Sequence, residues 1–582
     1  MPITDTPITL ENLRHLELRE RFRDDWRLNP ELYWPFLRPC TVKLLLVADD
    51  NLDFSENNFG LSTFVRSLLD MPGRHARFDI TLAHIDNVSG NRLMATETRI
   101  ARRIPTFKFD DASHFGTGMY DVVFLFGIDT AYGETRGKQY PSDRLSDTEL
   151  RALTQFMNGG GGLFATGDHG SLGRALCHAI PRVRGMRLWQ STFGSGGEDE
   201  VSMGGPRRND TNRPPGVSSF DDQSDDVPQT IQPRMYSRRN GLFRYSYPHP
   251  LLCGPRGVIR VMPDHAHEGE CVVPSATGAN LDFGGALGAE YPAATDGGPR
   301  PLPELVSTNT VLGGTRSGGK DPTQAQAFGG ICAYDGHRAG IGRVATDATW
   351  HHFVNVNLIG LFNDTGLPAG HVWRNGFLSS ASGQAHFEEI KSYYRNLAVW
   401  LSRPERIRCM NSRLYWTLLW DERVMEAVLT TPDIPLAKLD LGAIRLIGQH
   451  ARDVLGRFAG RCQGVRLALD LLYERLPPLI PEIDPWWPEP DPLREKFDGV
   501  EWLDGTQLFD IAIGSALVAL REAFPSPDEK SVRKLEGDQI EKVLQEGASA
   551  GLQRALESMT ASAELLAAIP KTVATQKPRK KR

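Results

Sequence analysis

The chain has 582 residues, of which 40% are hydrophobic and 24% are charged, and its formal net charge at pH 7 is −6. At roughly 150 residues per domain this length predicts several domains, and the mildly acidic balance argues against a general nucleic-acid-binding protein, which would need a basic surface. No apolar run approaches the ~20 residues that a membrane-spanning helix requires, so we expect neither a membrane nor a nucleic acid to be the partner.

The cysteines and the two ends of the chain predict a location. Seven cysteines are scattered without a CxxC pair, and the polar N-terminus does not read as a signal peptide. Scattered thiols of this kind are typical of small core residues in a reducing compartment. The sequence therefore predicts a cytoplasmic protein, and it predicts that the basic tail at 571–582 is disordered.

The first part of the chain alternates helical and strand patterns. A run such as Val42–Ala48, apolar at nearly every position, is typical of a strand buried on both faces. Ser146 and Glu149 have capping-box spacing, so a helix is expected to begin there and to end at the glycines from Gly159 onward. The predicted strands are 42–48, 78–84, 121–126 and 163–165, and the predicted helices are 1–40, 61–68, 150–156 and 172–180. This alternation predicts a three-layer, doubly wound α/β domain with a mainly parallel sheet.

The pattern changes twice after this region. Two Gly/Pro-rich insertions are expected at 191–235 and 275–328, with a strand at 257–262 between them, and the first insertion is predicted to be disordered or a mobile lid. A β-hairpin of 330–334 and 342–347 then leads to Trp350-His351-His352. From about 380 the periodicity is helical, with a long apolar seam from Ile444 to Leu472. We therefore predict an N-terminal helical segment at 1–40, an α/β domain at 41–375, and an all-α domain at 380–570.

Polar residues that follow the predicted strands are the site candidates, because ligands of doubly wound sheets bind beyond the carboxyl ends of the strands. Four loops carry such residues, and two other segments could reach the same edge. The candidates are Asp49, Asp50, Asn51, Asp129, Asp168, His169, Asp347, His351 and His352, with His249, His265, His267 and Glu268 from the other segments. An imidazole beside a carboxylate can act as a general acid or base, or can hold a divalent metal that activates water.

Each candidate has a structural alternative. Asp49 or Asp129 could simply cap the helix that follows its strand. Asp168 and His169 stand in a glycine-framed turn, which favours function, and adjacent histidines in an extended segment would point to opposite faces, so at least one of His351 and His352 is expected at the site. His169, His265, His267 and Glu268 are the metal candidates, although their spacing lacks a compact helical motif such as HExxH.

Several short motifs resemble one known superfamily. The capping helix, the glycine-rich start of the strand at 159–163 and the sharp polar turn after it resemble the class I glutamine amidotransferase-like superfamily. The hairpin with Gly340-Ile341-Gly342-Arg343-Val344 is similar to that of the ThuA-like (trehalose-utilisation) group, as is His249-Pro250 ahead of it. The resemblance covers roughly 40–365. It implies a flavodoxin-like fold and a carbohydrate-related or small polar ligand.

The chain departs from that superfamily at the nucleophile. Its amidotransferases carry a reactive cysteine in the sharp turn, whereas Asp168 or His169 stands there in this sequence, and Cys177 and Cys332 lie elsewhere. Without a thiol at the turn, glutamine hydrolysis through an acyl-enzyme has no nucleophile. We therefore expect no amidotransferase activity.

Two functional hypotheses follow. The first is an enzyme, a hydrolase in which Asp168 and His169 are central, His351 or His352 assists, and the acids and amides of the other loops position substrate or a metal. The second is a non-catalytic α/β sensor or scaffold whose helical domain binds a protein partner or a second copy of the chain.

Overall fold

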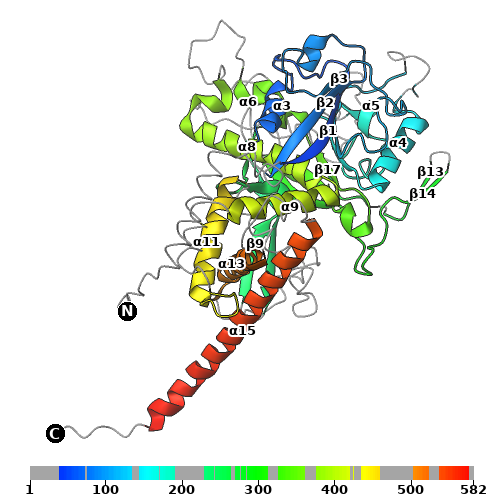
Figure 1. Cartoon of the computed structure of the whole chain (residues 1–582). Coiled ribbons are helices and arrows are strands. Elements are labelled where there is room, and N and C mark those ends of the chain that lie inside the picture. The colour runs from blue at the N-terminus through cyan, green and yellow to red at the C-terminus, as the bar shows by residue number, and fades with distance from the viewer. Residues whose placement is uncertain are drawn as a thin grey trace. The chain divides into compact units, whose positions relative to one another are not determined.

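Figure 1 shows the computed structural model of the chain. It describes residues 39–71, 75–133, 140, 143–168, 171–189, 229–240, 243–263, 269–275, 277–282, 285–311, 326–360, 375–419, 424, 434–458, 503–523 and 537–575. The chain divides into two compact units. The α/β unit comprises Cys40–Met235 and Pro248–Ile407, and the helical unit includes Tyr236–Tyr247 and the chain from Arg408 onward.

A nine-stranded mixed sheet is built from the described part of the α/β unit, in the order β3-β2-β1-β4-β5-β17-β16-β15-β7. The six strands from β3 to β17 are parallel to one another, and β16, β15 and β7 continue the sheet in antiparallel pairings. The predicted mainly parallel α/β sheet is therefore confirmed. The strands are β1 (Cys40–Ala48), β2 (Ala76–His84), β3 (Arg102–Ile104), β4 (Val122–Phe126), β5 (Gly162–Thr166), β7 (Gln232–Pro233), β15 (Glu304–Val311), β16 (Gln326–Tyr334) and β17 (Val344–Asp347).

Helices cover both faces of the sheet because the central strands are apolar on both faces. On β4, Val123 and Leu125 join the core that also holds helices α4 (Asp147–Asn158) and α5 (Arg174–Cys177). The alternate residues Phe124 and Phe126 contact Phe64 of α3 (Ser62–Leu69) on the other face. Helix α8 (Ala381–Trp400) packs against α3 on that same face. Figure 1 shows α4 and α5 on one side of the sheet and α3 and α8 on the other.

Local signals account for the elements around the candidate site. Helix α4 begins with the predicted capping box, in which the Ser146 hydroxyl and the Glu149 carboxylate each bond the other residue's backbone N–H. Gly162 begins β5 where a Cβ would lie 2.0 Å from the carbonyl oxygen of Leu401, so only glycine fits there. The predicted hairpin is present, with a 3₁₀ turn at Gly336–Ala339 between β16 and β17.

The structure corrects two of the predicted elements and adds strands that were not predicted. The helix expected at 172–180 is only α5, because Gly173 before it has a left-handed φ of 90° and Pro181 follows it closely. The strand expected at 257–262 is two short strands, β11 (Gly257–Val258) and β12 (Val261–Met262), which pair with different partners. Strands β3 and β15 were not predicted. The second lies within the insertion expected at 275–328, and its Ser, Thr and Asn side chains gave it no apolar pattern.

The helical unit has its own core. Buried residues of α11 (Leu441–Phe458), α13 (Gly505–Ala523) and α15 (Gly537–Thr575) form one cluster. Glycines let these helices approach closely, since a Cβ on Gly448 would lie 1.6 Å from the carbonyl oxygen of Asp510. Helix α8, placed by the sequence at the start of the helical domain, belongs to the α/β unit instead.

Several predictions fall at or beyond the described residues. Residues 571–575 of the tail that was predicted to be disordered are helical, as the end of α15. Other predicted segments lie outside the described residues, namely the rest of that tail, the N-terminal segment 1–38, most of the insertion at 191–235 and the helical seam after Phe458. None of the described helices combines the length and apolar character that crossing a membrane would take.

The cysteines are not all free thiols. Cys177, Cys253, Cys271 and Cys332 are buried free thiols, as expected for core residues. Cys40 and Cys409 are each disulfide-bonded, so the prediction of scattered reduced thiols is wrong for these two. Sequence spacing cannot identify such cysteines, because the fold decides which thiols meet.

Candidate functional site

Asp168 and His351 form a buried carboxylate–imidazole pair. Asp168 follows β5 by two residues and His351 follows β17 by four, and these strands are neighbours with Thr166 opposite Asp347. The Asp168 Oδ2 and His351 Nε2 atoms are 3.3 Å apart, and the side chains are 0% and 3% exposed. The pair therefore lies at the carboxyl edge of the sheet, where the sequence placed the site.

The second imidazole nitrogen of His351 has its own acceptor. Nδ1 of His351 lies 3.0 Å from Oδ1 of Asn357, which favours a proton on Nδ1. Nε2 then faces Oδ2 of Asp168 at ion-pair distance, although the geometry of these two atoms is not that of a hydrogen bond. A proton on either atom would relieve the repulsion between their lone pairs, and a pair that holds such a proton can serve as a general acid.

Asp347 and His352 form a second pair beside the first. His352 Nδ1 lies 2.8 Å from Oδ1 of Asp347 and 2.9 Å from Oδ2, with both side chains buried. The Tyr393 hydroxyl of α8 donates to Oδ2 of Asp347 at 2.7 Å, and the Tyr394 hydroxyl donates to the His352 carbonyl. The burial of Tyr393 and the Asp347 charge raise the pKa of the Tyr393 phenol well above its usual value, so it stays a donor. Asp347 thus fixes His352 as the tautomer with a proton on Nδ1, which leaves Nε2 as the basic nitrogen.

Thr349 joins the two pairs. Its hydroxyl donates to Oδ1 of Asp168 at 2.6 Å, and its backbone N–H donates to Oδ1 of Asp347 at 3.3 Å. The same hydroxyl accepts the backbone N–H of His351 at 3.0 Å, which caps the 3₁₀ turn Trp350–His352. This turn is why adjacent histidines reach different carboxylates. The extended segment that the sequence suggested is wrong, and both histidines lie at the site.

Arg187 holds the two site loops together. Its guanidinium is fully buried and donates to the carbonyl oxygens of Asp168 at 2.6 Å and Ala348 at 2.8 Å. Burial lowers the pKa of Arg187, while the charges of Asp168 and Asp347 act in the opposite direction. Trp189 packs against the guanidinium at 4.5 Å, which adds a cation–π contact. One buried cation thus contacts the backbone carbonyls of both site loops.

Aromatic residues cover His351. Trp350 stacks on its ring with centroids 4.3 Å apart, and Phe59 contacts both rings edge-on. Trp350 is buried, and its indole N–H has no hydrogen-bond partner. Phe59 is 48% exposed. Phe59 is therefore the outermost of these three side chains. The indole N–H of Trp350 is a buried hydrogen-bond donor beside the imidazole of His351.

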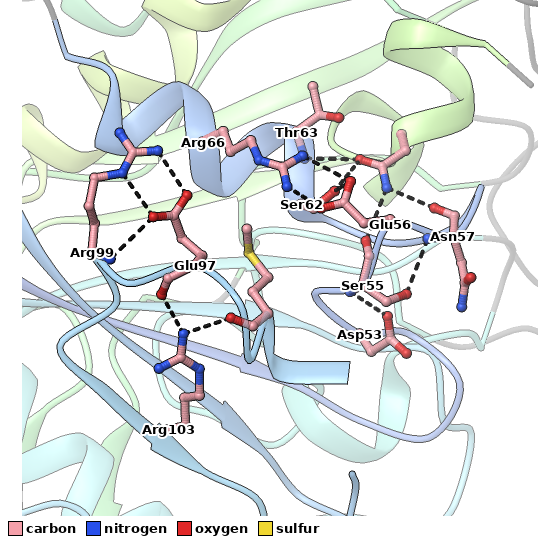
Figure 2. A network of polar contacts seen from close by, with 12 residues as sticks. Asp53, Ser55, Glu56, Asn57, Ser62, Thr63, Arg66, Glu97, Arg99 and Arg103 are labelled. Atoms are coloured by element: carbon pink, nitrogen blue, oxygen red, sulfur yellow. Dashed lines mark hydrogen bonds and ion pairs between the residues drawn. The ribbon is translucent and has the colours of Figure 1, made fainter. Parts of the chain in front are cut away.

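The loop that carries Phe59 is anchored by polar contacts. Asn355, three residues after His352, donates to the carbonyl oxygens of Ser55 and Asn57 and accepts the N–H of Thr63. Figure 2 shows the contacts that Asp53, Ser55 and Asn57 make with one another, and those of Glu56 with Ser62 and Arg66 of α3, which include the Glu56–Arg66 ion pair. The chain after β1 is thereby tied to the chain after β17.

The acids after β1 and β4 do not join the two pairs. Asp49 accepts the backbone N–H groups of Ile128 and Asp129 and the Tyr132 hydroxyl, the last at 2.8 Å. This is a structural role, but not the helix cap that the sequence suggested, because the carboxylate ties the end of one strand to the end of the next. Asp50 and Asn51 are exposed and bonded to each other, and Asp129 accepts the N–H of Ala131. His249 also lies away from the two pairs. It accepts the N–H of Leu251 and packs on the Trp400 ring. The Trp400 carbonyl accepts a hydrogen bond from Arg343 at the start of β17, which is the end of the sheet opposite the two pairs.

The metal candidates lie outside the description. His169, His265, His267 and Glu268 are not among the described residues. Where the structure is described, no three His, Cys, Asp or Glu side chains are placed so that they could hold a metal ion. The divalent metal therefore has no support from the donors that can be assessed, and we derive no step through one.

Three of the described free thiols are unsuited to nucleophilic catalysis. Burial raises the pKa of Cys177 and of Cys332 well above the usual thiol value, and it raises that of Cys271 to about 12. A reactive cysteine needs the opposite shift, towards the thiolate. The backbone of Asp168, in the turn after β5 where the superfamily carries its cysteine, does not have a left-handed φ, whereas the backbone of Asp50 does.

Sequence reasoning missed five residues of the site. Thr349 and Asn357 flank the two histidines within one short segment, and their polar side chains beside a predicted histidine site were an available signal. Arg187, Trp350 and Tyr393 gave no such signal. Their roles depend on burial and on contacts across the fold, which spacing does not reveal.

No protein-family model matches the chain, and a search of curated proteins finds no significantly similar sequence.

Proposed function

We propose that the α/β unit is an enzyme, a hydrolase that uses general acid–base chemistry on a small polar or carbohydrate-related substrate. The observation that carries this proposal is the presence of two buried carboxylate–imidazole pairs, Asp168–His351 and Asp347–His352, joined through Thr349. Buried titratable groups held in adjacent pairs are a pattern of acid–base sites.

The two pairs have different roles in this proposal. His352, with its Nδ1 proton held by Asp347, takes a proton from the attacking water through Nε2. The proton held between His351 and Asp168 passes to the leaving group as its bond to the substrate breaks. Water thus supplies the hydroxyl group to one product, and the other product gains a proton. Low exposure strengthens these interactions, because charges interact more strongly where water is excluded.

The substrate class rests on the polar character of the site and on the resemblance to ThuA-like proteins. The unpartnered Trp350 N–H is a donor for a substrate oxygen. When the short β3 is left aside, the parallel strands lie in the order second, first, third, fourth, fifth along the chain. This is the flavodoxin-like order, which supports the proposed relationship.

A substrate panel tests the proposal. The full chain is assayed with nitrophenyl glycosides and nitrophenyl esters, beside His352→Gln and Asp168→Asn. Loss of an acid or base typically lowers turnover by ~10²–10⁴-fold, so we expect at least one substrate whose hydrolysis falls by that factor in both variants. The matched control is His178→Gln, since His178 lies 3.8 Å from Asp143 in an imidazole–carboxylate contact elsewhere. Hydrolysis that both variants retain, or no hydrolysis across the panel, contradicts the proposal.

A second candidate function is binding of a partner by the helical unit. Leu556 and Leu565 of α15 are 36% and 68% exposed, which is unusual for leucines on a long helix. Light scattering of the full chain, beside a variant with both leucines changed to lysine, tests the simplest case of a second copy. A mass of 64.6 kDa for both proteins rules out self-association.

A further inference from the structure

A buried arginine lies at the other edge of the sheet from the acid–base pairs. Arg182 is fully buried and has a left-handed φ of 71°, which is uncommon for a residue other than glycine. Its Nη2 donates at 2.6 Å to Oδ1 of Asn158, the last residue of α4, and its Nε donates to the carbonyl oxygen of Glu290 at 2.7 Å. Asn158 precedes β5, so the guanidinium lies near the amino ends of the strands.

The charge of this guanidinium is not neutralised. Both of its hydrogen-bond acceptors are neutral, an amide and a carbonyl. The nearby carboxylate of Glu290 is already occupied, because Arg184 donates to Oε1 at 3.0 Å and to Oε2 at 2.5 Å. No described carboxylate lies within salt-bridge distance of Arg182 itself. Two arginines and one glutamate leave a net charge of +1, and a buried charge without a counter-charge is costly.

Two donors at this place have no acceptor. Nη1 of Arg182 has no hydrogen-bond partner, and neither does the hydroxyl of Tyr334 at the end of β16. Tyr334 is fully buried, and its ring packs edge-on against Tyr291 at 5.2 Å. The Tyr291 hydroxyl in turn donates to the Arg182 carbonyl at 3.1 Å, which joins the three residues in one cluster.

The titration behaviour agrees with this geometry. Burial raises the pKa of Tyr334 to about 12, so the phenol is a donor at neutral pH and does not supply the missing negative charge. Burial also lowers the pKa of Arg182. Among the neighbouring ionisable groups, Tyr334 has the largest electrostatic effect on the pKa of Arg182, and Arg182 has the largest effect on the pKa of Tyr334. The two side chains are therefore close to each other.

We propose that Arg182 and Tyr334 bind a small monovalent anion of the size of chloride. The anion accepts from Nη1 of Arg182 and from the Tyr334 hydroxyl, and its charge balances the guanidinium. Complete burial of both side chains limits the site to a small ion. A water molecule could accept the two hydrogen bonds, but it would leave the charge unbalanced. The site is separate from the proposed acid–base pairs and does not depend on them.

Stability in different salts tests the proposal. The thermal midpoint of the full chain is measured in sodium chloride and in sodium gluconate at equal ionic strength. Gluconate is too large for an enclosed site, so we expect a midpoint that rises with chloride concentration and then increases only logarithmically, as for a ligand that binds the folded state. Tyr334→Phe keeps the ring and removes one donor, so most of the chloride dependence is lost. Tyr120→Phe, in which a buried hydroxyl with a backbone acceptor is removed, is the control and keeps that dependence.

A crystal grown in sodium bromide gives a second readout that does not rely on any variant. The expected result is an anomalous peak within hydrogen-bond distance of both Nη1 and the Tyr334 hydroxyl. A water molecule there, without anomalous signal, overturns the proposal, as does a thermal midpoint that is the same in chloride and gluconate.

Discussion

Replacing Thr349 with valine is the sharpest test of the network that joins the two pairs. Valine has nearly the same shape, so Thr349→Val removes the hydroxyl without creating a cavity. The hydroxyl donates to a buried carboxylate at 2.6 Å and accepts a backbone N–H at 3.0 Å. A hydrogen bond to a charged group contributes about 1.5–3 kcal/mol and a neutral one about 0.5–1.5 kcal/mol. We therefore expect Thr349→Val to lower the free energy of unfolding by about 2–4 kcal/mol.

The control for this variant is Thr154→Val. Thr154 is also fully buried, and its hydroxyl donates only to the Leu150 carbonyl one turn earlier in α4. We expect a loss of about 1 kcal/mol there, as for a single neutral hydrogen bond. Because the chain has two units, a single unfolding transition is not assumed, and the assay is urea-dependent hydrogen exchange of peptides that cover β5 and β17. Equal losses in the two variants would refute the view that the Asp168 carboxylate depends on Thr349.

Three further predictions concern the rest of the α/β unit. Burial lowers the pKa of His75 to about 4 in the folded chain, whereas its pKa in the unfolded chain is about 6.5. Between these pH values the unfolded chain binds a proton that the folded chain does not. The free energy of unfolding should therefore fall by up to about 3 kcal/mol as the pH is lowered from about 6.5 to about 4. His75→Phe should remove that part of the fall, as seen in urea midpoints from pH 7 to pH 4, and an unchanged fall would contradict the assignment. Gly127→Ala places a Cβ 2.6 Å from Gly173 Cα and should cost about 1–3 kcal/mol by chemical denaturation, whereas Gly278→Ala, which meets open space, should cost far less. Asp49→Asn should lower the thermal midpoint and leave turnover of any panel substrate intact; a folded variant without turnover would return Asp49 to the catalytic residues.

The part of the fold that sequence reasoning found is the part with strong local signals. Continuous apolar runs identified β1 and β4, and the Ser146–Glu149 capping box identified the start of α4 within one residue. Strand β15 has the opposite character, because several of its residues are polar although it lies in the sheet. Its place depends on pairing with β16, which no local pattern contains.

The candidate site was likewise found in part. The rule that polar residues collect at the carboxyl ends of parallel strands located Asp168, Asp347 and the two histidines. It could not show that Asp49 is occupied by backbone N–H groups, since an acid after a strand looks the same whether it caps or reacts. Tyr393 was assigned to a different domain by its helical surroundings, and only packing of α8 on the sheet brings it to Asp347.

The proton between Asp168 and His351 is the central claim, and histidine ¹⁵N NMR measures it most directly. The full chain is labelled at histidine and compared with His351→Gln and His352→Gln, which assign the two signals by their disappearance. The account predicts that both imidazoles have a proton on Nδ1, next to Asn357 and Asp347 respectively, and that His351 has a second one on or shared with Nε2. Two neutral histidines that both carry the proton on Nε2 would contradict the account, since neither pair could then act as proposed.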